Sequence, residues 1–142
     1  TKASGPRVLR ARGEILSRLS SAYGGDYAAL CRATWTADRL WALASAHGGY
    51  TEGRATTRRL DLPGKQLLVN STTRPGGTLL IELLDEAGRV LPGFTATDCE
   101  PIAGDEHSAV VRWIGGDRAP PSASKVRFRF NRAFLYGFRL QH

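Results

Sequence analysis

Acidic side chains gather in one stretch of an otherwise basic chain. The four carboxylates are Asp98, Glu100, Asp105 and Glu106. Oxygen ligands on a loop suit Ca²⁺, so this stretch is a candidate calcium site. The alternative, which the sequence favours, is that the acids pair with arginines such as Arg89 and Arg112 or cap turns. Glycoside hydrolysis needs two carboxyl groups at a set separation, and four acids on one loop do not specify that geometry.

Aromatic side chains form the second candidate site, because an aromatic face can stack on a sugar ring. The candidate residues are Tyr50, Trp35 and Trp113. Tyr50 follows two glycines in a predicted loop and is the best surface candidate. Trp41 and Trp113 share strand faces with Leu43 and Val111, which favours a place in the core for both tryptophans.

Sequence motifs for catalysis are absent. There is no G-x-S-x-G, no P-loop and no G-x-G-x-x-G, and the three histidines have no zinc-ligand spacing. Cys31 and Cys99 are far apart and form no C-x-x-C. Two free, buried thiols are favoured, with a disulfide as the alternative in a secreted protein. We therefore predict no catalytic residues in this chain.

The charge of the chain raises the question of a nucleic-acid partner. The net charge is +7 and the isoelectric point is about 10.1, but Arg and Lys are spread along the sequence. Lys125, Arg127 and Arg129 alternate with apolar residues, as on a solvated sheet face. Arg58 and Arg59 belong to another predicted strand. Nucleic-acid binding is thus disfavoured, and no apolar run is long enough to span a bilayer.

Short strands must position these residues, and residues 78–113 are the stretch around which the strands are organised. Leu79, Ile81 and Leu83 share one strand face, and a glycine turn, a short strand, an acidic loop and a further strand follow. Nine strands are predicted at 28–35, 39–46, 56–62, 65–71, 78–84, 89–91, 109–113, 125–130 and 134–140. Residues 14–19 form either a short helix or an extended lead-in.

The strand spacing of roughly 8–12 residues with Gly or Pro turns predicts an all-β fold. We expect an antiparallel two-sheet β-sandwich of jelly-roll or concanavalin-like type. Its expected core consists of Trp41, Leu43, Leu67, Val69, Leu79, Ile81, Leu83, Val111, Trp113, Val126, Phe128, Phe130, Tyr136 and Phe138. The chain has no methionine and begins TKASG, so we expect a processed protein or a piece of a larger one.

Several segments resemble a known family. They read DEAGRVLPGF, DCEPIAGD, VVRW, KVRFRF and LYGFRL. Together they resemble the C-terminal β-sandwich of bacterial proteins similar to family-32 glycoside hydrolases, which include levanase-like and invertase-like enzymes. The resemblance covers residues 36–142 and leaves residues 1–35 as a lead-in segment or the remnant of a preceding domain. In that family the catalytic carboxylates lie on a neighbouring five-bladed propeller, and no position here matches them.

The resemblance implies an accessory domain that supports a neighbouring catalytic propeller domain in a secreted or periplasmic protein. The chain is not expected to be catalytic by itself, and its parent is expected to be a glycoside hydrolase. One alternative is a carbohydrate-binding module that recognises glycans through exposed aromatic residues. A basic nucleic-acid-binding domain is the third and least favoured alternative. Calcium is the only cofactor that the sequence suggests.

Overall fold

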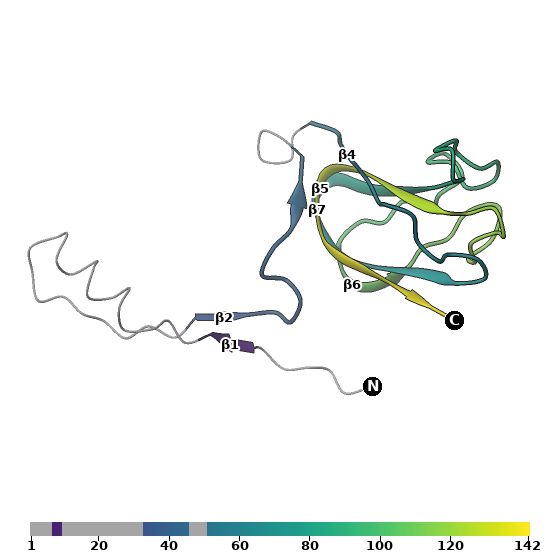
Figure 1. Cartoon of the computed structure of the whole chain (residues 1–142). Coiled ribbons are helices and arrows are strands. Elements are labelled where there is room, and N and C mark those ends of the chain that lie inside the picture. The colour runs from purple at the N-terminus through teal and green to yellow at the C-terminus, as the bar shows by residue number, and fades with distance from the viewer. Residues whose placement is uncertain (1–6, 10–32, 46–50) are drawn as a thin grey trace, which may run out of the picture. The chain divides into compact units, whose positions relative to one another are not determined.

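The structure, a computed structural model, describes residues 7–9, 33–45 and 51–142 and has strands but no helix within them (Figure 1). The predicted all-β, antiparallel class is therefore confirmed. The chain divides into two units, residues 1–40 and residues 41–142. The boundary predicted from the sequence lies after residue 35.

The first unit contains one pair of short strands. β1 (Arg7–Leu9) pairs antiparallel with β2 (Ala33–Trp35), so that Arg7 lies opposite Trp35. The predicted helix or lead-in at residues 14–19 lies outside the described residues. Of the strand predicted at 28–35, the structure describes residues 33–35, and these are in strand conformation.

The second unit is built on one sheet. Its strands are β3 (Leu43–Ala44), β4 (Gly53–Thr56), β5 (Gln66–Leu84), β6 (Asp105–Val110) and β7 (Lys125–Gln141). The strand order is β3-β7-β5-β6, and β4 pairs with another part of β7. Every pair is antiparallel. The five strands belong to one hydrogen-bonded sheet, where the sequence analysis expected two sheets.

Two long strands give this sheet its shape. β5 and β7 pair from Gln66 opposite Gln141 to Leu84 opposite Lys125, and the register shifts between Thr73 and Thr78. Here residues 74–77 of β5 bulge opposite β7, and Figure 1 shows both strands bending together. A Cβ atom on Gly77 would lie 2.5 Å from the carbonyl oxygen of Arg132, so only glycine fits this close approach. Residues 74–77 and 131–133, predicted as connections, are therefore bends inside continuous strands.

The bend brings the two halves of the sheet face to face around the apolar core. The first half of β5 contributes Leu67 and Val69, and the second half contributes Leu79, Ile81 and Leu83. From β7 and the loops come Val126, Phe128, Phe130, Val111 and Trp113. These ten residues were expected in the core and are all buried.

Four other residues expected in the core lie elsewhere. Trp41 is 83% exposed, Leu43 is 55% exposed and Phe138 is 37% exposed, while Tyr136 is half-buried. The prediction of burial was wrong for Trp41, Leu43 and Phe138. Leu43 lies in β3, a two-residue edge strand, Trp41 precedes it, and Phe138 lies on β7 beyond the residues that pair with β3. An edge strand has a neighbour on one side only, so its alternating apolar side chains are not covered on both faces.

Candidate functional site

The predicted sugar-stacking residues lie in different parts of the chain. Trp113 is 6% exposed, its Nε1–H donates to the Ile81 carbonyl at 2.7 Å, and its ring packs against Phe94 at 5.6 Å. Its place in the candidate site is corrected, because an enclosed indole has no free face for a sugar. Trp35 is half-buried on β2 in the first unit. Tyr50 lies outside the described residues.

The predicted calcium ligands are distributed over different elements. Asp98 lies in a turn, where its carboxylate accepts hydrogen bonds from the hydroxyl of Thr95 at 2.7 Å and from the amide of Thr95 at 3.0 Å. These two bonds lower the pKa of Asp98 below its usual value. Asp105 and Glu106 open β6 rather than lying in a loop. Among the described residues no three acidic, histidine or cysteine side chains gather in a way that could hold a metal ion.

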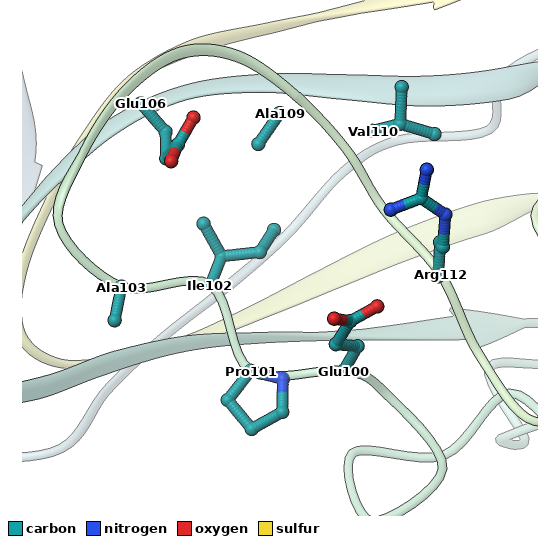
Figure 2. Close-up of a pocket in the computed structure, with 8 residues that line it drawn as sticks. All are labelled: Glu100, Pro101, Ile102, Ala103, Glu106, Ala109, Val110 and Arg112. Carbon is teal, nitrogen blue, oxygen red and sulfur yellow. The ribbon is translucent and has the colours of Figure 1, made fainter.

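Glu100 and Glu106 instead line a shallow hollow of about 270 Å³ together with Arg112 (Figure 2). Figure 2 shows Glu106 at the opposite end of this hollow from Arg112, with Ile102 between them. Arg89, which was expected to pair with the acidic loop, pairs with Asp85 at 2.8 Å. The calcium site stays a prediction, and the hollow offers no convergent set of ligands for it.

The basic strand face is largely neutralised within the chain. Arg127 lies opposite Glu82 in the register and their side chains are 3.2 Å apart. Arg129 contacts the same carboxylate at 3.6 Å and reaches Glu52 at 3.0 Å, and Glu52 also holds Arg54 at 2.9 Å. Glu82 is 7% exposed. The sequence signal for this network was Glu82 on the polar face of an otherwise apolar strand.

The Arg129 and Arg54 guanidinium groups lower the pKa of Glu52, and Glu52 in turn raises the pKa of Arg129. Arginines held in this way are less available to phosphate groups than the free sheet face that the sequence suggested.

An apolar hollow of about 350 Å³, here called the Trp41 groove, lies where β3, β4 and β7 meet. Its lining residues are Trp41, Ala42, Leu43, Ala55, Thr56, Thr57, Phe128, Leu135, Tyr136, Gly137 and Phe138. The rings of Phe128 and Phe138 pack 5.3 Å apart at its base. The groove therefore continues the core out to the surface, where Trp41 stands open.

The polar atoms of the Trp41 groove are already engaged. The Thr57 hydroxyl accepts from the Val126 amide at 3.1 Å, and the Thr56 hydroxyl accepts from Arg127 at 3.3 Å. The Tyr136 hydroxyl bonds the Thr72 hydroxyl at 3.1 Å. No charged or amide side chain is found among the described residues that line the groove. It can bind by apolar contact and offers few groups to orient a polar ligand.

Sequence reasoning missed this groove because it depends on where the strands end. Residues 39–46 were predicted as one strand covered on both faces, whereas only Leu43 and Ala44 pair with β7. The signal that could have found it is the run of large apolar residues at Leu40, Trp41 and Leu43 just before a predicted glycine loop.

Cys99 is free and buried. Its thiol donates to the Glu100 carbonyl and accepts from the Ile81 amide, both at 3.4 Å. Burial raises the pKa of this thiol to about 11, so it is protonated and unreactive near neutral pH. Cys31 lies outside the described residues.

Comparison with other proteins leaves the family resemblance as a prediction. No family model, no curated protein and no solved structure matches this chain. Among the described residues, no helix has the length and apolar character needed to cross a membrane.

Proposed function

We propose that residues 41–142 form an accessory domain that packs, through the Trp41 groove, against a neighbouring domain of a carbohydrate-active protein. The observation that carries this proposal is an open groove whose described lining residues are mostly apolar. An exposed indole beside the buried ring of Phe128 and the partly exposed ring of Phe138 is typical of a protein contact site, where aromatic anchors supply most of the binding energy.

The family resemblance supplies the kind of neighbour. It implies a catalytic propeller domain whose own residues carry out glycoside hydrolysis, while this domain stabilises it. The described residues that line the groove carry apolar and hydroxyl side chains, which suit contact with such a neighbour.

A carbohydrate-binding module is the second candidate, and exposed Trp41 favours it. Sugar sites combine a stacking ring with hydrogen-bonding side chains that orient the hydroxyl groups. Among the described residues that line the Trp41 groove, the side-chain polar atoms other than the indole nitrogen are hydroxyls that already hold bonds within the chain. The groove chemistry therefore favours an apolar protein surface over a sugar.

The test compares this chain with the longer product of its gene. Acrylamide quenching of Trp41 and amide exchange at residues 134–138 should both fall when the neighbouring domain is present. Trp41→Ser removes the fluorophore and should restore amide exchange at residues 134–138, whereas Ile114→Ser should leave both readouts unchanged. Ile114 is a matched control because it is 81% exposed in a loop outside the groove.

A gene product without a further domain, or a groove equally exposed in the longer product, refutes the docking role. The same samples should be titrated with sucrose, inulin and levan. Binding in the micromolar range that is lost in Trp41→Ala or Tyr50→Ala would establish the carbohydrate-binding function instead. Turnover of these glycans by the chain alone would overturn the non-catalytic role.

A further inference from the structure

The last residues of β7 form an open sheet edge. β7 pairs with β5 along its length, and at residues 127–130 and 134–135 it also pairs with β4 or β3 on its other side. β4 pairs with Phe130 to Arg127 and β3 pairs with only Leu135 and Phe134. Within the part of the chain that the structure describes, no strand pairs with Gly137–Gln141 on the β3 side.

A bulge explains why β3 stops where it does. Gly137 lies opposite Asn70 and Leu135 lies opposite Ser71, so Tyr136 is the extra residue on β7. A bulge bends its strand and ends regular pairing with the neighbour. The Trp41 groove lies beside this bulge and is lined by residues 41–43 and by residues 135–138 of β7.

The side chains along this edge are apolar and only partly covered. Phe138 and Leu140 lie opposite Val69 and Leu67, two core residues, and so face the same side of the sheet as the core. Phe138 is nevertheless 37% exposed and Leu140 is half-buried. An added strand would cover both side chains and would satisfy the backbone groups along the edge. A helix or a sugar could not pair with that backbone in register.

A second copy of this chain does not fit the edge. An antiparallel self-pairing that matches Phe138 with Leu140 places Arg139 directly opposite Arg139, and like charges in that position destabilise a strand pair. The exposed parts of Trp41, Leu43 and Phe138 amount to roughly 400 Å², against about 800 Å² per partner in a stable interface. The chain also carries a net charge of +7, which favours an acidic partner.

We propose that the edge of β7 at Gly137–Gln141 accepts an extended, acidic β-strand from another polypeptide, whose apolar side chains enter the Trp41 groove. The proposal rests on the docking role and names how the partner binds. An acidic residue opposite Arg139 and apolar residues on either side of it give the best match to this edge.

The test selects random peptides from a display library against the whole chain. We expect the selected peptides to alternate apolar and polar residues, to carry a net negative charge and to bind with micromolar dissociation constants. Each winner is then resynthesised with N-methyl groups on alternate amides. One set of methyl groups should weaken binding by about tenfold or more and the other set should leave it within about twofold, because only alternate amides face the edge.

Variants of the chain provide the second readout. Consecutive backbone amides point in opposite directions, so only one of Arg139→Pro and Leu140→Pro breaks a bond to β5. The variant that stays folded by circular dichroism should lose peptide binding. Arg139→Ala should keep binding but reduce the preference for acidic peptides.

Three results would overturn strand addition. The first is that neither set of N-methyl groups weakens the binding of the selected peptides, and the second is that the folded proline variant binds them as well as the unchanged chain does. The third is that no selected peptide binds with a dissociation constant below about 100 µM. If N-methylation leaves peptide binding unchanged but Trp41→Ser abolishes it, the docking role is retained and the added strand is rejected. Glycan binding at the groove removes the docking role itself.

Discussion

Replacing Trp113 with phenylalanine tests how the core is held together. The indole is 6% exposed and its Nε1–H donates to the Ile81 carbonyl at 2.7 Å. Phenylalanine keeps an aromatic ring but has no donor, so a buried carbonyl loses this partner, at a cost of about 1–3 kcal/mol. The smaller ring also leaves a few tens of Å³ empty, which at about 24 cal/mol per Å³ adds about 1 kcal/mol.

The expected loss in the free energy of unfolding is therefore about 2–4 kcal/mol. The assay is urea denaturation of the whole chain followed by far-ultraviolet circular dichroism, because fluorescence would change with the tryptophan content. Trp41→Phe is the matched control. It makes the same chemical change at an 83% exposed site and should shift the free energy by no more than about 0.5 kcal/mol.

A loss below about 1 kcal/mol for Trp113→Phe would refute the reasoning, since the hydrogen bond alone is expected to contribute that much. Equal losses in the two variants would also refute it. That result would mean that Trp41 is as enclosed as Trp113 and that the Trp41 groove is not open.

Four further predictions follow from other contacts. Glu82→Gln should lower the free energy of unfolding by about 1–3 kcal/mol in urea melts, because two arginines lose a nearly buried charge; an unchanged melt would show that the network is not stabilising. Because Glu52 has a lowered pKa, its stabilising effect is present above the ordinary value of 4.5 and is lost as pH falls through its folded-state pKa. In melts across an acid pH series, the stability of Glu52→Gln should therefore fall less steeply with decreasing pH than that of the unchanged chain. Equal slopes for the two proteins would contradict this. Ser71→Ala should leave stability unchanged or raise it by about 1 kcal/mol in thermal melts, because the buried hydroxyl has no hydrogen-bond partner among the described residues; a large loss would show a hidden partner. Fluorescence anisotropy with oligonucleotides should detect only weak binding at low salt, and submicromolar binding at about 150 mM salt would make nucleic acid the leading partner.

Local signals predicted much of the second unit correctly. The alternation in residues 125–130 gave the inward set Val126, Phe128 and Phe130. The turn after Leu84 was also predicted correctly: Gly88 has φ of 84° and its amide donates to the Asp85 carbonyl at 3.1 Å. Both features depend on neighbouring residues only, so the sequence is sufficient to specify them.

The features that sequence reasoning missed depend on pairing between distant segments. Arg74–Gly77 has the composition of a loop, yet the ladder between β5 and β7 continues on both sides of it. Trp41 and Leu43 have the composition of a buried strand, yet their burial depends on whether another strand covers β3. The tertiary arrangement overrides local composition in both cases.

The position of β7 in the sheet also constrains when the domain can form during synthesis. β3, β4 and most of β5 each find their main partner in β7. Among the earlier strands that the structure describes in this unit, only β5 and β6 pair with each other. Until the ribosome has released β7, a nascent chain can make one hairpin-like pair and leaves the other apolar strands without partners. We therefore expect the domain to fold only after its synthesis, and a premature stop before Lys125 to yield an aggregation-prone fragment rather than a smaller stable domain.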